Sequence, residues 1–427
     1  MKPEANNEEA EGDQGFPTVA GDVIGDTAYS ERFVLKILLK LANLDTLKEE
    51  INEKSFEDDL CILWDMTAER DVVLFLQKHD VLKLFNFAMP MVQLPRIIEI
   101  IVGIIGNMCC QKEVVTNLMK MNNFVALLLG YINTDDSLVL VQLLRLVSAC
   151  LFLAESDVTE WMDLFISTEY STALYFIFKN SSNKDLLVTA FENLNTICSY
   201  CNIEKCRTKY FEHFVTEDAL ESLVTAFIEL SVKQNKLFVK DELERMLVVN
   251  FQIILNLVGF DKSQEIYGGS INNLLNMINV TLSYYQEKLV KHKEIDTDLI
   301  DIIESTNTII NVLKINEVGP DMYLEPCFCI WTNVRLLSKI EEKDSFDDDK
   351  KDLIEFSDKI QPALGTLICN YISKCSDKDL LRVLDLIESN YEDIVNVVQD
   401  EDLKISVSSR TEKYRTRLKD NINEINC

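Results

Sequence analysis

Two stretches of this sequence repeat one another and decide the fold: 65-DMTAERDVVLFLQKHDVL-82 and 107-NMCCQKEVVTNLMKMNNF-124. When the first is laid on the second at an offset of 42 residues, Asp71-Val72-Val73 falls on Glu113-Val114-Val115. Leu76 then falls on Leu118. The apolar residues of both stretches recur at the spacing of an amphipathic helix. One helical unit is therefore used twice.

The repeat continues beyond the second stretch. Glu155 and Val158 follow Glu113 and Val115 after 42 and 43 residues, which indicates a third unit. Segments that begin near Leu138 and Leu186 also superpose, each after a polar turn, at 133–136 and 180–183. The Asp residues in the polar turn at 133–136 are suited to cap the helix that follows. Similar helix ends recur later, around 255–257 and 310–312, at longer spacings.

A purely helical repeat of about 42 residues lies in the range of armadillo and HEAT repeats. Only 12 Gly and 7 Pro serve the 427 residues, which fits helices joined by short turns. We therefore expect an all-α fold, an armadillo/HEAT-like α-solenoid that winds into a right-handed superhelix.

The charge and the cysteines narrow the function classes. A formal net charge of −29 opposes direct binding to nucleic acid or to anionic membranes. No apolar run reaches the roughly 18–20 residues of a membrane span. The 12 cysteines lie mostly in apolar helical patterns and do not resemble a secreted disulfide framework. We expect a soluble protein of a reducing compartment.

The chain divides by composition into five segments. We expect an acidic, disordered tail over 1–20, a helical repeat array over 21–340 and an acidic loop or linker over 341–352. Further helices of the array should follow over 353–400. The last segment, 401–427, is predicted to be a basic and mobile tail.

Several local strings resemble the serum amyloid A-like protein family, an armadillo-type family. They are Gly21-Asp22-Val23-Ile24-Gly25 with Tyr29-Ser30, Trp64-Asp65-Met66 with Asp71-Val72 and Phe75-Leu76-Gln77, Glu99-Ile100 with Val102-Gly103-Ile104 and Gly106-Asn107-Met108, and Asp185-Leu186-Leu187-Val188. They cover residues 20 to 190. The resemblance implies a protein of the nucleus or cytoplasm that has no enzymatic activity and is linked to cell proliferation.

A set of polar residues recurs near the end of one helix in successive units. In armadillo arrays generally, the third helix of each unit lines a concave groove. An Asn there can bind the backbone of an extended peptide, because its amide both donates and accepts. The alternative is that these side chains cap helix ends or pack between units. The predicted partner-binding residues are Trp64, Asp65, Asn107, Ser148, Asn195 and Asn256.

Metal and catalytic chemistry have little support in the sequence. Cys198, Cys201 and Cys206, with His213, have the ligand count of a zinc site, although reduced cysteines at a helix end explain them better. The chain has three histidines, and none lies in a nucleophile or general-base motif. We expect no cofactor and no enzymatic activity.

The leading hypothesis is a scaffold or adaptor that binds extended or helical segments of partner proteins in its groove. One alternative is a nuclear import adaptor that recognises basic signals, since acidic helical arrays can do so. A second is an RNA-associated regulator that acts through the basic C-terminal tail.

Overall fold

The computed structural model describes residues 21–154, 158–315, 319–341 and 348–425. These residues form α-helices with a few short 3-10 and π segments, and no strand occurs among them. The predicted all-α fold is confirmed. The superhelix remains a prediction. Within the described ranges, no helix is both long and apolar enough to cross a membrane.

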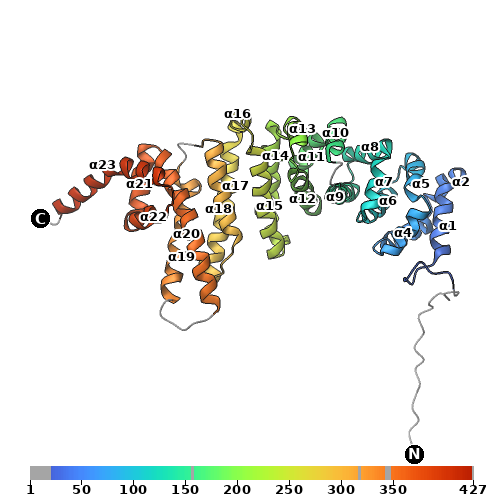
Figure 1. Cartoon of the computed structure of the whole chain (residues 1–427), viewed down its shortest axis with the longest axis horizontal. Coiled ribbons are helices and arrows are strands. Elements are labelled where there is room, and N and C mark those ends of the chain that lie inside the picture. Colours follow the sequence, from blue (N-terminus) through green and yellow to red (C-terminus); the bar gives the residue numbers. More distant parts are fainter. Residues whose placement is uncertain (1–20, 155–157, 316–318, 342–347, 426–427) are drawn as a thin grey trace, which may run out of the picture. The chain divides into compact units, whose positions relative to one another are not determined.

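Two compact units divide the chain, with the boundary after Ala154. The predicted array over 21–340 includes residues of both units. The helices of unit 1 are α1 Glu31–Ala42, α2 Leu44–Glu50, α3 Lys54–Met66, α4 Arg70–Lys78, α5 Val81–Ala88, η1 Met89–Met91, α6 Pro95–Met108, α7 Lys112–Met119, α8 Asn122–Gly130, η2 Tyr131–Asn133 and α9 Ser137–Leu153 (Figure 1).

Unit 2 holds the remaining helices. They are α10 Val158–Ser167, α11 Tyr170–Asn180, α12 Lys184–Cys198, α13 Glu204–Phe214, α14 Glu217–Ile228, η3 Glu229–Lys233, η4 Asn235–Leu237, α15 Lys240–Val258, α16 Ser263–Tyr267, η5 Gly268–Ser270, α17 Ile271–Glu287, η6 Lys288–His292, α18 Asp298–Val312, η7 Pro320–Met322, α19 Leu324–Glu341, α20 Asp348–Lys374, α21 Asp377–Ile387, η8 Glu388–Asn390, α22 Tyr391–Val397 and α23 Glu401–Ile425.

The 42-residue repeat corresponds to a three-helix unit. Helices α4, α5 and α6 are followed by α7, α8 and α9, and the two copies of the repeated stretch superpose α4 on α7. The helix before each copy ends at the repeated dipeptide, Asp65-Met66 in α3 and Asn107-Met108 in α6. In unit 1, α3 packs on α6 and α6 packs on α9.

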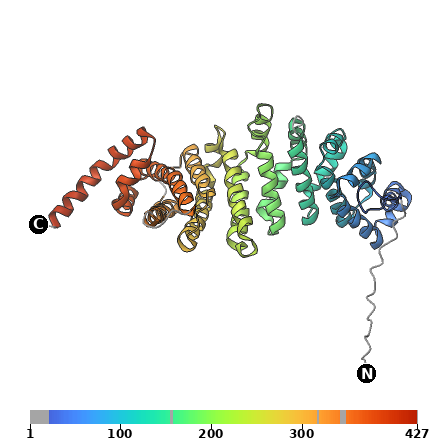
Figure 2. The same ribbon diagram turned by 60° about the horizontal axis from the view of Figure 1, so that its bottom comes forward.

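Within unit 2 the helices pack in two rows. One row runs α12, α15, α18, α20, and the other runs α11, α14, α17, α19, with each helix packed on the next (Figures 1 and 2). Apolar side chains fill the space between the rows, among them the fully buried Leu187, Ile254 and Ile303. Because each helix is covered by its neighbours, stability accumulates along the stack.

Polar residues start several helices as their positions predict. The Asp136 carboxylate accepts hydrogen bonds from the backbone N–H groups of Leu138 and Val139, both at 3.0 Å, and begins α9. Asn183 caps α12 in the same way. Such caps satisfy backbone donors that the first turn of a helix leaves without partners.

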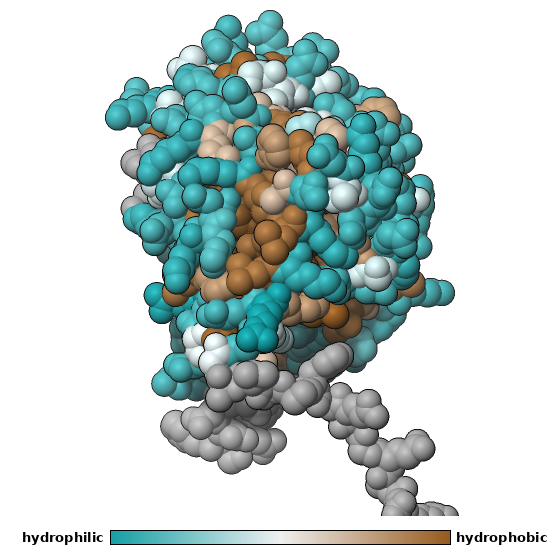
Figure 3. All heavy atoms as spheres, turned by 90° about the vertical axis from the view of Figure 1, so that its right-hand side faces the viewer, coloured by the Kyte–Doolittle hydropathy of each residue, from teal (hydrophilic) through white to brown (hydrophobic). Residues whose placement is uncertain are grey.

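The first helix of unit 1 leaves apolar side chains exposed. Leu39 on α1 is 69% exposed, and apolar groups gather within a polar frame on the face of the molecule drawn in Figure 3. The turn that precedes α1 packs on α4, where Gly25 lies against Asp71. Gly25 adopts a φ of +54°. A left-handed φ favours glycine.

Two predicted segment boundaries need correction. Residues 342–347 of the predicted acidic linker lie outside the described residues, as does the predicted tail over 1–20, but α20 already begins at Asp348. Residues 401–425, predicted as a mobile tail, form helix α23. The helix packs on α20 and buries Val407 and Thr411, and these anchors are too sparse to stand out in a basic sequence.

Candidate functional site

The predicted tryptophan of unit 1 packs against a glycine of the next helix. A Cβ atom added to Gly103 in α6 would lie 2.3 Å from the Trp64 indole, far inside van der Waals contact. Trp64 is half-buried and lies near the end of α3. The missing side chain of Gly103 therefore makes room for the indole, and this contact joins α3 to α6.

Asn107 strengthens the same junction. Its Nδ2 donates to the hydroxyl of Thr67 at 3.0 Å and to the carbonyl of Trp64 at 3.4 Å. The Trp64 carbonyl lies in the last turn of α3 and Thr67 directly follows the helix, so both acceptors lie at its C-terminal end. The arrangement fits the helix-bridging alternative for Asn107. Its peptide contact stays a prediction.

Asp65 and Ser148, the other predicted partner-binding residues of unit 1, do not take part in this junction. Asp65 is exposed at the end of α3. Ser148 is half-buried, and its hydroxyl donates to the carbonyl of Leu144 on its own helix, α9, at 3.0 Å. A serine that bonds one turn back along its helix has less capacity for a ligand.

The predicted residues of unit 2 lie in a connected group of amides. Asn195 of α12 donates from Nδ2 to Oε1 of Gln252 on α15, at 3.2 Å. Asn256 donates to the backbone carbonyl of Gln252 at 2.8 Å. Its own side-chain oxygen accepts from the thiol of Cys201 at 3.0 Å. Asn195 and Asn256 are thus brought to one face of adjacent helices.

A second group of polar side chains, on α18 and α20, consists of residues that sequence reasoning missed. Asn370 of α20 donates to Oδ1 of Asn307 on α18 at 2.6 Å, and Asn311 donates to the same atom at 3.4 Å. Lys374 donates to Oδ1 of Asn311. We name this set the polar ladder. Its members are Asn195, Gln252, Asn256, Asn307, Asn311, Asn370 and Lys374.

The polar ladder has a regular geometry. On each of α15, α18 and α20 two of its members are four residues apart, so they lie one turn apart on one face. The helices that carry them pack in the order α12, α15, α18, α20. Gln252 is exposed and the other members are half-buried, which leaves them within reach of a ligand. The recurring polar pair near the end of an apolar helix is the signal that could have revealed the missed residues.

The amides keep hydrogen-bonding capacity beyond these contacts. A primary amide has two N–H donors and an oxygen that can accept twice. The contacts above use one donor direction each on Asn195, Asn256 and Asn370. An extended peptide backbone needs such donors and acceptors in alternation, because its own groups are unpaired. The polar ladder can therefore hydrogen-bond an extended segment.

The zinc ligands considered for unit 2 do not come together. The Cys198 thiol lies 3.0 Å from the hydroxyl of Tyr210, and Cys201 donates to Asn256. Cys206 lies 3.8 Å from the hydroxyl of Thr159. Burial raises the pKa of Cys198 to about 12, which opposes the thiolate that zinc requires.

His213, the fourth residue of that set, also has a structural role. Its Nε2 accepts a hydrogen bond from the backbone N–H of Ser171 at 3.2 Å. Among the residues that the structure describes, no group of three or more His, Cys, Asp and Glu side chains could hold a metal ion. The structure thus gives each of the four residues a separate contact, with Tyr210, Asn256, Thr159 and Ser171, as expected for reduced cysteines and a histidine packed between helices.

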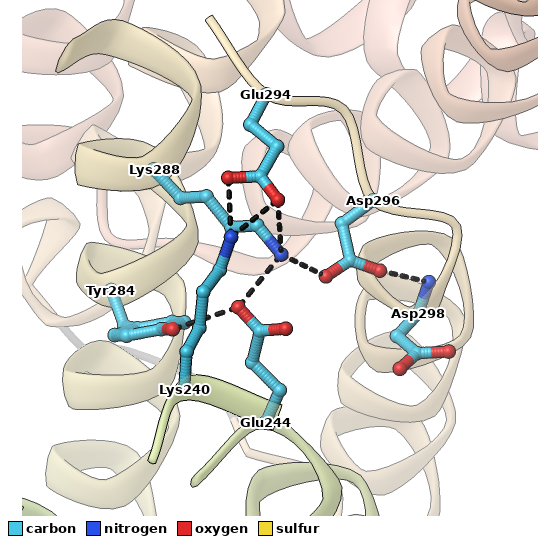
Figure 4. Close-up of polar contacts among 7 residues, drawn as sticks. All are labelled: Lys240, Glu244, Tyr284, Lys288, Glu294, Asp296 and Asp298. Atoms are coloured by element: carbon cyan, nitrogen blue, oxygen red, sulfur yellow. Dashed lines mark hydrogen bonds and ion pairs between the residues drawn. The ribbon is translucent and has the colours of Figure 1, made fainter. Parts of the chain in front are cut away.

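A buried ion cluster of unit 2 was not foreseen either (Figure 4). Lys288 of η6 contacts Glu244 of α15 at 2.7 Å and Asp296, before α18, at 2.5 Å. Its side chain is 6% exposed. Tyr284 donates to Glu244 at 2.8 Å, and Lys240 pairs with Glu294. The cluster joins α15, α17 and the connection that leads to α18.

The pKa of Lys288 follows from these contacts. Burial alone would lower it, because a charged ammonium loses its hydration. Hydrogen bonds to Asp296 and Glu244 outweigh the loss, and the pKa lies above the usual value for lysine. Lys288 thus stays protonated and holds the connection in place. Lys288 and Asp296 are close in sequence, but Glu244 comes from α15, and the sequence does not show that this helix packs here.

Two pockets lie in unit 1, away from the polar ladder. One, of about 510 Å³, is a shallow surface hollow beside α1. The other measures about 260 Å³ and lies where α4 and α5 meet the turn between α7 and α8. None of the predicted partner-binding residues lines either pocket.

The fold and the polar ladder define an all-α protein of stacked helices. Similar proteins are known. Protein saal1 of Danio rerio is 30% identical over 197 residues, which are 44% of this chain and 41% of that protein. Protein SAAL1 of Homo sapiens is 32% identical over 187 residues, 40% of this chain and 39% of that protein. The chain thus aligns with about two fifths of the length of these relatives.

Other comparisons add little. No family model matches the chain. The crystal structure of an engineered protein covers 89% of this chain and 98% of its own, with 10% identity and a TM-score of 0.37, a score that supports no argument about fold or function.

The assignment of the chain to a serum amyloid A-like family is corrected by these findings. The relatives carry a corresponding name, but the similarity reaches only 40–44% of the chain, and no family model supports it. The similarity is local. The strings that suggested a family also have structural roles here, as the contact of Gly103 with Trp64 shows.

Proposed function

We propose that the chain is a non-enzymatic protein-interaction module whose polar ladder binds an extended segment of a partner protein. The observation that carries the proposal is the run of amides over four consecutively packed helices, α12, α15, α18 and α20. Primary amides suit a peptide backbone because they donate and accept without adding charge.

The dimensions fit a short segment. Packed helices lie about 8–10 Å apart, so crossing four of them takes roughly 27 Å. An extended chain advances about 3.4 Å per residue, and about eight residues would span the polar ladder. Exposed acids on the same helices, such as Asp185 and Glu304, add a preference for a segment with some basic residues.

The proposed setting is the nucleus or the cytoplasm, where thiols stay reduced. The cysteines of the described part are free, and most of them are buried in apolar surroundings. Free buried cysteines behave as small apolar residues and are common in reducing compartments.

Affinity capture from cell extract, followed by mass spectrometry, tests the proposal. The wild-type chain is compared with a variant that carries Asn195→Ala, Asn307→Ala and Asn370→Ala. A matched control carries Asn180→Ala, Asn273→Ala and Asn276→Ala, which are exposed asparagines of α11 and α17 in the other row. Circular dichroism confirms that all three are folded.

The proposal predicts that the ladder variant loses partners that the control keeps. Equal partner sets for the wild type, the ladder variant and the control would contradict it. Loss from the control alone would move the binding surface to the row of α11 and α17.

A further inference from the structure

With one exception, every lysine that the structure describes as buried or half-buried contacts a carboxylate. The pairs are Lys40–Glu50 at 2.7 Å, Lys184–Glu242 at 2.7 Å, Lys209–Asp163 at 2.5 Å, Lys288–Asp296 at 2.5 Å and Lys404–Glu401 at 2.7 Å. The exception is Lys374, which is half-buried at the end of α20. In a chain with 71 acidic and 42 basic residues, a sheltered cation of this kind is unexpected.

Lys374 contacts an amide in place of an acid. Its Nζ donates to Oδ1 of Asn311. That contact orients the Asn311 amide, so its Nδ2 faces Asn307, whose Oδ1 also accepts from Asn370. The ammonium keeps further N–H donors, and the Nδ2 groups of Asn311 and Asn370 each have a second N–H. Lys374, Asn311 and Asn370 therefore each keep an N–H donor at this end of the polar ladder.

The acids nearest in sequence are bound to arginines. Asp377 lies 3.7 Å from Arg410 of α23, and Asp379 lies 3.6 Å from Arg382. Burial lowers the pKa of Lys374, since the charged form loses hydration that the neutral amide of Asn311 does not replace. A bound anion would restore the interaction that the other sheltered lysines have.

A helix-end role alone does not explain the position of Lys374. A lysine in the last turn interacts favourably with the negative end of the helix dipole, and an exposed side chain is sufficient for that. Lys374 is instead half-buried, and it lies four residues after Asn370. It continues the pattern of paired positions that Gln252 and Asn256 show on α15.

We propose that Lys374, together with the amides of Asn311 and Asn370, binds the carboxylate of an Asp or Glu side chain in the partner segment. This inference rests on the proposed function and specifies the chemistry at one end of that segment. A carboxylate fits better than a phosphate, because a net charge of −29 repels a dianion more strongly than a monoanion. The partner segment would then bind in one orientation, with its acidic residue at α20.

Selection of linear 12-residue peptides from a random display library against the full chain provides the probes. Each selected peptide is titrated against the wild type, against the ladder variant with Asn195→Ala, Asn307→Ala and Asn370→Ala, and against Lys374→Met, Lys374→Arg and Lys378→Met. Lys378 is an exposed lysine four residues further on and serves as the matched control. Peptides in which the acid is changed to its amide, or to phosphoserine, complete the set.

We expect selected peptides to share an Asp or Glu. Loss of that acid or the Lys374→Met change should weaken binding at least fivefold, and the two changes together should cost no more than one alone. Lys374→Arg should retain most of the binding, and Lys378→Met all of it.

Each contrary outcome has a distinct meaning. Binding that depends on Asn195 and Asn307 but shows no coupling between an acid and Lys374 overturns the carboxylate site and leaves the proposed function standing. Tighter binding of the phosphoserine peptides through Lys374 overturns the choice of carboxylate. Peptides insensitive to the polar ladder, or no peptides at all, contradict the proposed function and the inference with it.

Discussion

Equivalent helix positions have different structural roles in the two units. In α6 of unit 1, the residue four places before Asn107 is Gly103, which admits the Trp64 indole. On α15, α18 and α20 of unit 2 two ladder members lie four residues apart. The first of the two, at the place that Gly103 takes in α6, is Gln252, Asn307 or Asn370. The glycine lets two helices close on an aromatic ring, whereas the amides keep polar groups at the surface.

Asparagines of the two units also differ in what they bond. The Nδ2 of Asn107 donates to Thr67 and Trp64, at the end of α3. Asn307 instead accepts from two amides and leaves its own Nδ2 outside the contacts described above. The same residue type therefore joins helices in unit 1 and, on the proposed function, binds a partner in unit 2. The following predictions are ways to break or sharpen this contrast.

The largest effect is expected in the ion cluster of unit 2. Lys288→Met leaves Glu244 and Asp296 buried without their cation, so the free energy of unfolding should fall by about 3–5 kcal/mol. Urea unfolding followed by circular dichroism measures it. The control Lys291→Met removes an exposed pair with Glu287 and should cost under about 0.5 kcal/mol. Similar losses for both variants would show that the cluster is not a structural anchor.

A smaller loss is expected at the junction of unit 1. Gly103→Ala places a Cβ 2.3 Å from the Trp64 indole and should destabilise the chain by about 1–3 kcal/mol. Gly106→Ala on the same helix meets its nearest atoms at 3.8 Å, so it should be neutral or stabilising by up to about 1 kcal/mol. Thermal unfolding compares the two.

A double-mutant cycle sharpens this test. In a Trp64→Ala background the added methyl group no longer meets the ring, so Gly103→Ala should lose most of its cost. A cost that persists unchanged in that background would mean that the glycine serves some purpose other than making room for Trp64.

The smallest effect concerns pH. Burial lowers the pKa of His213 below its usual value, because the charged imidazolium is poorly hydrated there, although a backbone interaction at Phe165 opposes the shift. The unfolded chain then takes up the proton first as pH falls. The stability that the neutral side chain provides is present above the unfolded pKa and is lost as pH drops towards the folded one.

His213→Gln should therefore reduce the loss of stability between pH 7 and pH 5. The exposed His79 offers the control, since His79→Gln should leave that dependence as in the wild type. Melting temperatures at the two pH values decide the point. Identical pH profiles for His213→Gln and the wild type would contradict the assigned role.

Much of the fold followed from short-range patterns. The 42-residue offset predicted helices whose ends coincide with those of α3 and α6, because apolar spacing and helix caps are local properties. The division after Ala154 and the docking of α23 depend on long-range packing, which leaves little trace in composition.

The candidate site was predictable only in part. Asn195 and Asn256 were found because they recur near helix ends. Asn307, Asn370 and Lys374 were missed because the spacing between units lengthens in that region, and an offset of 42 residues no longer aligns them. Cysteines that are close in sequence contact different neighbours, Cys198 the hydroxyl of Tyr210 and Cys201 the side chain of Asn256, and their spacing alone does not show this.

One paired measurement tests the central claim, that the unit 1 asparagine holds the fold and the unit 2 asparagine binds a partner. The free energy of unfolding and the amount of captured partner are measured for Asn107→Ala and Asn307→Ala side by side. The account predicts that Asn107→Ala loses about 1–2 kcal/mol of stability and keeps its partner. It predicts that Asn307→Ala keeps its stability within about 1 kcal/mol and loses most of its partner. The reverse pattern, or equal effects of the two variants on both readouts, would contradict the account.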